Sequence, residues 1–313
     1  MSLEPIRHAF VLGAGLGTRL RSLTAHRPKP LIPICQKPLI SFAFDRLIDL
    51  GVRELVVNTH HRAEMYARFF PGSEYRGTPI RFRHEDDLLE TGGGIKNVED
   101  LFSGKPFVVY NGDIYTDLPL QAALERHFAN GNEATLVLRS KDGPLQVAFD
   151  EDSGRVVDIA RRCGTAVEPR FLFTGIYILQ PEFFARLPAN TKFSVIDTFA
   201  EMIREKARIG GVVIDQGQWW DLGDREKYLD LHRQLARLSV PGLSWRDPSA
   251  RIDPSAKISG ATVIGAHCRV GARALLHDCI LWEHADIASG AALTNCIVAS
   301  REIVRGIHHD SDF

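Results

Sequence analysis

The sequence predicts an α/β protein: a Rossmann-like mixed sheet with helices on both faces, followed by a short C-terminal left-handed parallel β-helix. Three observations point to this fold class. Short apolar strands alternate with amphipathic helices over about the first 240 residues, as in a sheet covered by helices. Glycine-containing turns follow two of these strands. Beyond Pro241, aliphatic residues recur every six positions, which is the repeat of a parallel β-helix.

In the first part of the chain, apolar runs and capping residues define the elements. Predicted strands cover residues 9–12, 54–58, 80–82, 107–110, 135–138, 171–179 and 212–214. Predicted helices cover residues 41–51, 62–70 and 95–101, a segment from about 120, and residues 194–205 and 224–238. Ser194, in a variant of the capping box, and Asp224 are the predicted caps of the last two. The turns Gly13–Gly15 and Asn111–Asp113 follow the carboxyl ends of their strands, where ligands bind in such sheets.

The C-terminal part carries the hexapeptide pattern. Its inward anchors are Ile252, Ile258, Ile264 and Val270, and the period continues less regularly through Leu276, Ile287 and Leu293. The segment has room for about three coils, since one coil takes three hexads. We therefore predict two domains, an α/β domain at 1–240 and a β-helix domain at 241–313. We expect the β-helix domain to extend a core or to form a homo-oligomer.

Composition narrows the classes of partner. The chain has 313 residues, of which 44% are hydrophobic and 25% charged, and its formal net charge is -1. This balance gives no reason to expect a nucleic acid or a membrane as partner. The N-terminus lacks the pattern of a signal peptide, and five scattered cysteines form no C-x-x-C pair. We expect reduced thiols and a cytoplasmic location.

The segment from Leu12 to Pro33 has the composition of a phosphate-binding loop. Glycines after a strand let backbone N–H groups approach a phosphate closely. A dinucleotide fingerprint would place glycine where Thr18 stands, and a Walker A loop would need a Gly-Lys-Ser/Thr sequence that is absent. Arg19 and Lys29 follow the glycines, and two cations at this place suit a triphosphate. Prolines on both sides of Lys29 argue against an ordinary solvated lysine.

Five motifs together resemble the sugar-1-phosphate nucleotidyltransferases. They are Gly13–Arg19 with Lys29–Pro33, Leu89–Gly94, Asn111–Asp113, Thr174–Tyr177 and Trp220–Gly223. The resemblance implies that Arg19, Lys29 and Asp113 are catalytic. The nucleotide-binding residues that it implies are Leu12, Gly13, Ala14, Gly15, Gly17, Thr18, Arg19, Glu85, Thr91 and Gly92.

The resemblance also implies a metal. Asp113 and Asp221 would together hold Mg²⁺, whose preference for oxygen ligands and retained waters suits two carboxylates and substrate phosphates. From the residues alone, Asp113 is equally a turn-forming aspartate and Asp221 an ordinary loop residue.

On the sugar side, the residues carried over from the family are Asn111, Glu168, Gly175 and Lys192. Many relatives have Glu-Lys-Pro where this chain reads Glu168-Pro169-Arg170, so Lys192 or Arg170 would supply the missing cation. The string Leu89–Gly94 resembles N-acetylmuramate-1-phosphate uridylyltransferases, whereas the hexapeptide tail resembles guanylyltransferases acting on mannose or heptose phosphates. Both UTP and GTP therefore stay open.

The expected reaction needs no general base, because a sugar 1-phosphate is largely ionised near neutral pH, with a second pKa of about 6. Two other functions remain. A non-catalytic regulatory homologue would bind nucleotide sugar, but such proteins tend to lose the loop cations or the metal carboxylates, which this chain retains. An acyltransferase would use His267, His277 or His284 of the β-helix, where so few coils make a poor cofactor cleft.

Overall fold

The structure is a computed structural model that describes residues 6–15, 17–20, 22–102 and 104–313, with only the backbone at positions 18 and 22. The chain divides into two compact units. Unit 1 comprises residues 1–16 and 40–220, and unit 2 comprises residues 17–39 and 221–313. This division differs from the predicted domain boundary at residue 240, because residues 17–39 and 221–240 group with the β-helix. That domain boundary stays a prediction.

Unit 1 is built on a ten-stranded sheet in the described part of the chain, with strand order β10-β11-β13-β9-β12-β7-β1-β4-β6-β5. Its strands are β1 (His8–Leu12), β4 (Glu54–Thr59), β5 (Glu74–Tyr75), β6 (Thr78–His84), β7 (Phe107–Asn111), β9 (Ala134–Arg139), β10 (Val147–Asp150), β11 (Arg155–Ile159), β12 (Leu172–Leu179) and β13 (Ile209–Val213). A separate pair joins β8 (Ile114–Thr116) to β14 (Trp219–Asp221), whose first two residues belong to this unit.

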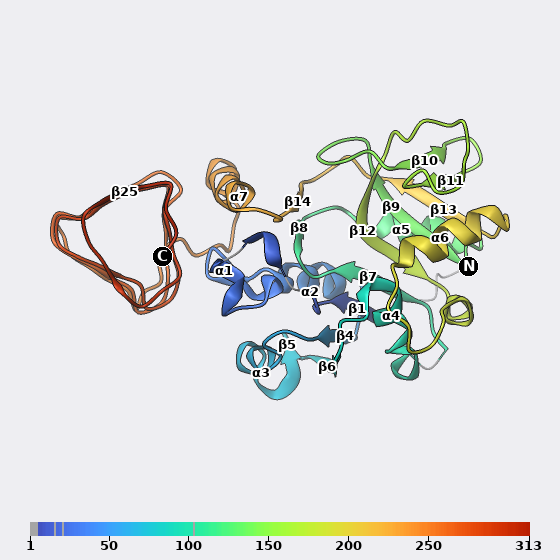
Figure 1. Cartoon of the computed structure of the whole chain (residues 1–313), viewed down its shortest axis with the longest axis horizontal. Coiled ribbons are helices and arrows are strands. Elements are labelled where there is room, and N and C mark those ends of the chain that lie inside the picture. Colours follow the sequence, from blue (N-terminus) through green and yellow to red (C-terminus); the bar gives the residue numbers. More distant parts are fainter. Residues whose placement is uncertain (1–5, 16, 21, 103) are drawn as a thin grey trace. The chain divides into compact units, whose positions relative to one another are not determined.

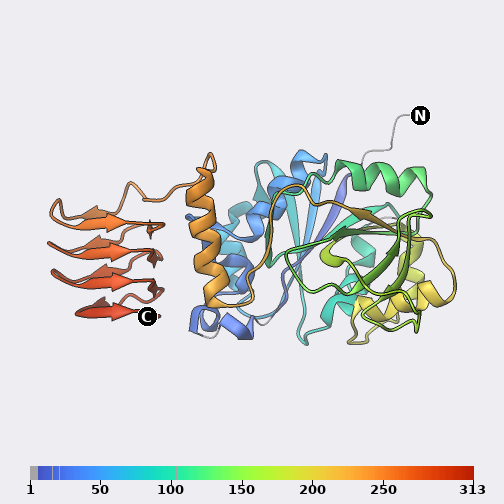
Figure 2. The same cartoon turned by 90° about the horizontal axis from the view of Figure 1, so that it is seen from above.

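Helices cover both faces of this sheet, as predicted. They are α2 (Ile40–Asp49), α3 (Glu64–Phe69), α4 (Glu90–Lys96), α5 (Gln121–Ala129) and α6 (Val195–Arg204), with short 3₁₀ turns at Pro71–Ser73, Glu99–Leu101 and Pro181–Arg186. Figures 1 and 2 show α5 on one side of the sheet and α6 on the other. The side chain of Ser194 accepts a hydrogen bond from the N–H of Ile196, so the predicted cap of α6 is present.

The sheet is mixed because β12 runs antiparallel to both of its neighbours, β7 and β9. The central strands β1, β4 and β7 are parallel to one another. Buried side chains from these strands and from α4 and α6 form one hydrophobic core, in which Phe10, Val109 and Phe199 are fully buried. The parallel strands direct their carboxyl ends to one edge, so Leu12, Thr59 and Asn111 end their strands there.

Unit 2 combines an N-terminal segment with the C-terminal region. The N-terminal segment contains 3₁₀ turns at Thr18–Leu20 and Lys29–Leu31, the short helix α1 (Ser22–Ala25), and a hairpin of β2 (Pro33–Ile34) and β3 (Lys37–Pro38). The long helix α7 (Arg225–Leu238) begins at Asp224, whose carboxylate accepts a hydrogen bond from the N–H of Lys227, as the sequence predicted. Figure 2 shows α7 standing beside the stacked coils.

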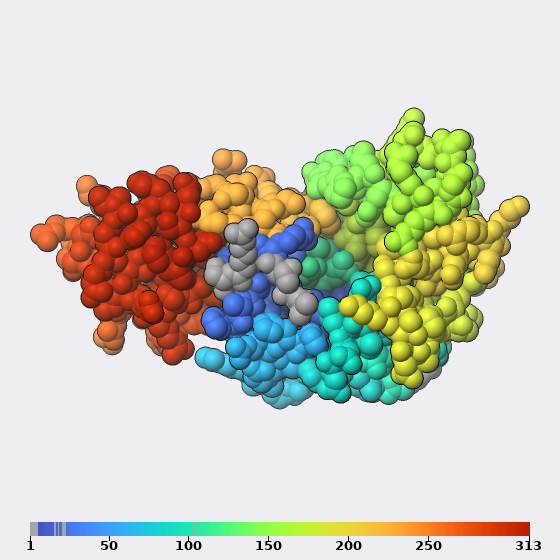
Figure 3. Space-filling model, viewed as in Figure 1, coloured from blue at the N-terminus to red at the C-terminus, as the bar shows by residue number. Residues whose placement is uncertain are grey.

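The stacked coils form the predicted β-helix. Three parallel sheets make its sides: β15 (Arg251–Ile252), β18 (Arg269–Val270), β21 (Asp286–Ile287) and β24 (Ile303–Val304); β16 (Lys257–Ser259), β19 (Leu275–His277), β22 (Ala292–Thr294) and β25 (Ile307–His309); and β17 (Val263–Ile264), β20 (Ile280–Leu281) and β23 (Ile297–Val298). Three complete coils and part of a fourth are therefore present. They appear as the red body in Figure 3.

The β-helix explains the irregular repeat. Ile252 pairs with Val270, but Val270 pairs with Ile287 and Ile287 with Val304, so the coil shortens from 18 residues to 17 after the first turn. Because one residue is missing, the anchor Leu281 follows Leu276 after five positions, whereas earlier anchors are six positions apart. The anchors from Ile264 onward nevertheless stay buried, and Ile252 and Ile258 of the first coil pack against them partly buried, which keeps one continuous core.

Within the described residues, no helix combines the length and the apolar character needed to span a bilayer. All five cysteines are free thiols.

Candidate functional site

In unit 1, the glycine turn after β1 is held from two sides. The N–H of Gly13 donates to Oδ1 of Asn58 across 2.8 Å, and the hydroxyl of Tyr66 donates to the carbonyl of Gly13 across 2.9 Å. A Cβ added at Gly13 would lie 2.6 Å from the carbonyl oxygen of Asn58, so only glycine fits here. Ala14 is buried behind the turn and Gly15 is exposed. The turn is therefore a fixed piece of backbone.

Asn58 connects this turn to Glu85 at the end of β6. The amide of Asn58 donates to Oε1 of Glu85 across 2.7 Å, and the N–H of Leu89 donates to Oε2 across 3.1 Å. Glu85 is only 2% exposed. One oxygen of Glu85 thus holds Asn58, which supports the glycine turn, and the other holds the backbone just before α4. The nucleotide contact predicted for Glu85 would come in addition. Asn58 and Tyr66 were not among the predicted site residues. Asn58 could have been suspected, because it is a polar residue at the end of the apolar run Leu55–Val57.

The predicted nucleobase residues lie against the chain segment before α6. The hydroxyl of Thr91 accepts a hydrogen bond from the N–H of Val195 across 2.9 Å, and the N–H of Gly92 donates to the carbonyl of Phe193 across 3.0 Å. A Cβ at Gly92 would lie 2.3 Å from the ring of Phe193. Glycines 92–94 are therefore packing positions inside α4. Lys192 belongs to the same segment and is exposed, with its Nζ 3.9 Å from Glu90.

Asn111 and Gly175, both predicted to bind the sugar phosphate, lie together. Gly175 has a φ of 80°, and a Cβ there would lie 2.4 Å from the side-chain nitrogen of Asn111. The adjacent Gly112 approaches the carbonyl of Leu12 so closely that a Cβ would lie 2.7 Å from it. The turn that carries Asp113 thus lies beside the end of β1.

Asp113 also has an electrostatic relationship to the glycine turn. Burial, with the negative charge of Asp113 as a second cause, raises the pKa of the Tyr66 phenol above its ordinary value. Because Tyr66 donates to Gly13, the carboxylate of Asp113 lies near the backbone predicted to hold phosphate.

Glu168, the remaining sugar-side residue, is exposed on unit 1. Its carboxylate is 70% exposed and pairs with Arg161 across 2.9 Å. In the described part of the chain, no hydrogen bond or ion pair joins Glu168 to Asn111 or Gly175. Its role in binding sugar stays a prediction.

In unit 2, two cations and one carboxylate from distant parts of the sequence come together. Nζ of Lys29 donates to Oδ1 of Asp221 across 3.0 Å, and Nη2 of Arg19 donates to Oδ2 across 3.3 Å. Lys29 is only 4% exposed, so it is not a solvated loop lysine, whereas the side chain of Arg19 is 68% exposed. Gly223 allows this arrangement, since a Cβ there would lie 2.6 Å from the guanidinium of Arg19.

The backbone of the same loop is fixed at Gly17. Its φ is 62°, which favours glycine, and its carbonyl accepts a hydrogen bond from the hydroxyl of Thr24 across 2.9 Å. The side chain of Thr18, predicted to bind nucleotide, lies outside the described residues.

The two cations keep Asp221 ionised. Burial alone would raise the pKa of Asp221, but the charge and hydrogen bond of Lys29, followed by those of Arg19, hold the pKa below its ordinary value. An ionised carboxylate of this kind is a suitable oxygen donor for Mg²⁺. Asp113 belongs to unit 1 and Asp221 to unit 2, and their joint role as metal ligands stays a prediction. The described residues contain no group of three or more His, Cys, Asp or Glu side chains arranged to hold a metal.

The β-helix histidines have structural partners. The rings of His267 and His284 stack with centroids 5.1 Å apart on neighbouring coils. His277 lies 3.0 Å from the hydroxyl of Ser259. These contacts join residues of neighbouring coils, as expected for histidines stacked along a repeat.

Comparisons with known proteins agree with the five motifs. Residues 8–237 match the family model described as nucleotidyl transferase, and residues 241–309 match the model described as GMPPB C-terminal domain. A UTP–glucose-1-phosphate uridylyltransferase from Synechocystis is 26% identical, covering 95% of this chain and 88% of the relative. The mannose-1-phosphate guanylyltransferase catalytic subunit beta from Danio rerio is 28% identical, covering 93% of this chain and 85% of the relative.

Among solved structures, HddC from Yersinia pseudotuberculosis complexed with GMP-PN superposes with a TM-score of 0.60 at 24% identity, covering 72% of this chain and 97% of HddC. This likeness shows the fold. Because the nucleotidyl transferase model matches far more than half of the 313 residues, the chain belongs to the nucleotidyl transferase family, among the sugar-1-phosphate nucleotidyltransferases.

Proposed function

We propose that the protein transfers a nucleoside monophosphate from GTP or UTP to a sugar 1-phosphate and releases pyrophosphate. The observation that carries this proposal is the cluster of Arg19, Lys29 and Asp221, in which a buried lysine and an exposed arginine share one ionised carboxylate. A buried cation is costly unless it is paired, so its retention beside a predicted phosphate loop supports a role in binding phosphate.

In the proposed reaction, an oxygen of the sugar phosphate attacks the α-phosphorus of the NTP in line. The new P–O bond forms as the bond between the α-phosphorus and the bridging oxygen breaks, and that oxygen leaves with pyrophosphate. Lys29 would contact the α-phosphate or the sugar phosphate, and Arg19 the leaving pyrophosphate. The fixed turn at Gly13 would present backbone N–H groups to the triphosphate. Positioning and charge then carry the catalysis without a general base.

Asp113 and Asp221 are the proposed ligands of Mg²⁺. Both provide oxygen donors, and Lys29 and Arg19 hold Asp221 in its ionised form. When bound, Mg²⁺ would neutralise charge that develops on the phosphates.

For the base, the proposal includes both GTP and UTP. The match of residues 241–309 to a GMPPB C-terminal domain and the guanylyltransferase names among the relatives favour GTP. The uridylyltransferase from Synechocystis and the string Leu89–Gly94 favour UTP. We propose a cytoplasmic location, where these substrates occur together.

A panel of GTP and UTP against mannose, heptose, glucose and N-acetylmuramate 1-phosphates tests the proposal. We expect Mg²⁺-dependent pyrophosphate release with at least one pair, and its loss in Asp113→Asn. If no pair of substrates gave a product, the proposed transferase activity would be refuted. Full activity of Asp113→Asn would refute the metal assignment. A regulatory homologue, the second candidate, would bind a nucleotide sugar but release no pyrophosphate.

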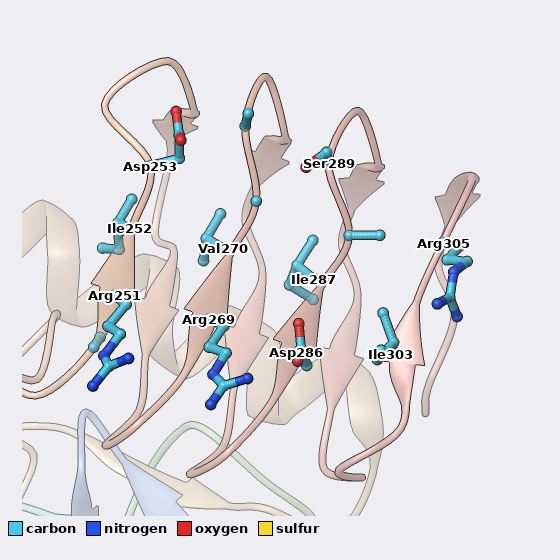
Figure 4. Close-up of a pocket in the computed structure, with 14 residues that line it drawn as sticks. Arg251, Ile252, Asp253, Arg269, Val270, Asp286, Ile287, Ser289, Ile303 and Arg305 are labelled. Atoms are coloured by element: carbon cyan, nitrogen blue, oxygen red, sulfur yellow. The ribbon is translucent and has the colours of Figure 1, made fainter.

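We also propose a homo-oligomer formed through the β-helix, on the sheet β15-β18-β21-β24. The outward residues of successive strands are Arg251, Arg269, Asp286 and Ile303 (Figure 4). Two positions further along the chain come Asp253, Gly271, Ala288 and Arg305. They line an open pocket of about 1010 Å³.

This charge pattern is self-complementary. A two-fold axis along the strand direction, between the second and third strands, exchanges the first strand with the fourth and the second with the third. Arg269 would then face Asp286 of a second copy, and Asp253 would face Arg305, each twice. The small Gly271 and Ala288 would allow the two sheets to approach.

A further inference from the structure

The segment that carries Arg19 and Lys29 is fastened to the β-helix through Arg27. Arg27 is 8% exposed, and its guanidinium carbon lies 4.5 Å from the ring centroid of Trp282. The same guanidinium donates to the carboxylate of Glu283. Trp282 and Glu283 follow strand β20 of the second coil, at a corner of the β-helix. A stacked, paired arginine has little freedom to leave this place.

A second connection reaches the other side of Lys29. The hydroxyl of Tyr228 on α7 donates to the carbonyl of Pro33 across 2.5 Å, and it accepts a hydrogen bond from the indole N–H of Trp282 across 3.1 Å. Tyr228 is fully buried and Trp282 is 4% exposed. Trp282 therefore touches both ends of the stretch from Arg27 to Pro33, directly at the first and through Tyr228 at the second.

The hairpin after Pro33 is fixed in the same way. The side-chain amide of Gln36 donates to the carbonyl of Ile264 in the β-helix across 2.8 Å. The N–H of Cys35 lies 3.3 Å from Nε2 of His232 on α7. Cys35 and Gln36 both have positive φ, 47° and 76°, a strained pair that persists only where its surroundings hold it.

We propose that Trp282 and Glu283 are positioning residues, which hold the loop between Arg19 and Pro33 so that Lys29 and Arg19 meet the phosphates in the reactive geometry. Lys29 lies two residues after Arg27 and four before Pro33, so both fastened points are close to it in the chain. The β-helix would therefore support the reaction centre through Trp282 and Glu283. This inference rests on the proposed transfer reaction and adds to it a role for the C-terminal coils.

The physical reason is preorganisation. In its described residues the loop has little regular structure of its own, namely the 3₁₀ turns at 18–20 and 29–31 and the four-residue helix α1. Such short pieces are not stable without tertiary contacts. Because a displacement of about 1 Å at a reacting group can lower the rate about a hundredfold, loss of these contacts would reduce turnover more than binding.

The first test is kinetic and uses the full chain. We expect Trp282→Ala and Glu283→Gln to lower kcat by about ten- to a hundredfold, with KM for the sugar 1-phosphate changed by less than about threefold. Trp282→Phe keeps an aromatic face for Arg27 and should retain more of the activity than Trp282→Ala. Tyr228→Phe removes only the hydroxyl that links Trp282 to Pro33. Glu302→Gln, an exposed glutamate of the same β-helix, is the matched control and should behave as wild type.

The second test does not depend on activity. Hydrogen exchange of peptides covering residues 17–39 should be faster in Trp282→Ala than in Glu302→Gln, above all at the amides of Leu31 and Ile32, which donate to Pro28 and Lys29. Peptides from the sheet of unit 1 and from the β-helix strands of unit 2 should keep their protection, which shows that both units of the variant fold.

The outcomes separate the two proposals. If wild type transfers no nucleotide, the proposed function fails, while exchange still reports whether Trp282 holds the loop. If Trp282→Ala and Glu283→Gln keep the wild-type kcat and loop protection, the positioning role is overturned. Rescue of kcat in Trp282→Phe relative to Trp282→Ala, with equal unfolding midpoints, would support it.

Discussion

Nζ of Lys29 donates to Oδ1 of Asp221 across 3.0 Å, with 4% of Lys29 exposed and the two residues 192 positions apart in the chain. Asp221→Asn would remove the charge that offsets burial of this ammonium. We expect a loss of about 1–3 kcal/mol in the free energy of unfolding, together with a large loss of pyrophosphate release. Urea unfolding and the transfer assay measure the two effects. Glu151→Gln, on an exposed turn, serves as control, and an unchanged midpoint in Asp221→Asn would contradict the expectation.

Asn58 joins the glycine turn to Glu85, so its removal should affect both. Asn58→Ala would leave the N–H of Gly13 and the carboxylate of Glu85 without this partner, and we expect a loss of about 2–4 kcal/mol in unfolding free energy. KM for the NTP should rise because the turn loses its support. Asn130→Ala, an exposed asparagine, is the comparison. Wild-type stability in Asn58→Ala would show that the network contributes little.

Gly92 packs against the ring of Phe193, and adding a single methyl group at this position tests that contact. In Gly92→Ala the new Cβ would overlap the ring of Phe193, and we expect a destabilisation of about 1–3 kcal/mol. Gly15→Ala places its Cβ in open space and should leave the unfolding midpoint unchanged. The double variant Gly92→Ala/Phe193→Ala should show less than the sum of the two single losses. Strict additivity of the two losses would argue against this contact.

Two buried histidines predict how stability depends on pH. Burial lowers the pKa of His127 to about 4, and burial, partly opposed by a hydrogen bond to the carbonyl of Tyr228, lowers the pKa of His232 to about 4. Above the unfolded-state pKa of about 6.5, both states leave the histidine neutral and its burial does not reduce stability. Between pH 6.5 and pH 4 only the unfolded state binds a proton, which favours unfolding.

The free energy of unfolding should therefore fall as the pH drops through this window, by up to about 3 kcal/mol per histidine at pH 4. Urea midpoints measured from pH 7 to pH 4 check this. His232→Gln should flatten part of the slope, whereas His309→Gln, on an exposed strand, should not. A slope unaffected by His232→Gln would sink the assignment.

The proposed two-fold contact of the β-helix predicts a charge-reversal pattern. Arg269→Asp would place two carboxylates opposite each other at two symmetric positions, and we expect dimer affinity to fall about tenfold or more. Arg269→Asp/Asp286→Arg restores the complementary pairs and should restore the dimer. Sedimentation equilibrium provides the measurement, with Arg301→Asp as an exposed control outside the pattern. A monomeric wild type would rule out this oligomer.

The sequence predicted the elements better than their directions. The strand at 172–179 was recognisable from its apolar residues, but nothing in a side-chain pattern shows that it runs antiparallel to β7 and β9. Strands β10 and β11 were missed, because Val147–Asp150 is short and lies at the edge of the sheet, where patterns are weakest. The caps Ser194 and Asp224 were recognisable because a cap is a local interaction.

The candidate site divides in the same way. Gly13, Arg19 and Lys29 were evident from their spacing in one short segment. Asn58 and Trp282 were not evident, because both act through contacts with residues far away in the sequence. Asn58 bonds to Gly13, 45 positions away, and the ring of Trp282 stacks against Arg27. A helix through Gly92–Gly94 was unexpected because glycine disfavours helices, and here packing against Phe193 outweighs that preference.

The division of unit 2 between the two ends of the chain has a consequence for biosynthesis. Arg27, Pro33 and Gln36 leave the ribosome early, but their partners Glu283, Tyr228 and Ile264 follow 256, 195 and 228 residues later. At about 5–20 residues per second, this is a delay on the order of tens of seconds. The segment that carries Lys29 is thus translated early but is among the last parts of the reaction centre to find its fold. A nascent chain stalled before the second coil would still lack Trp282 and Glu283, which hold Arg27.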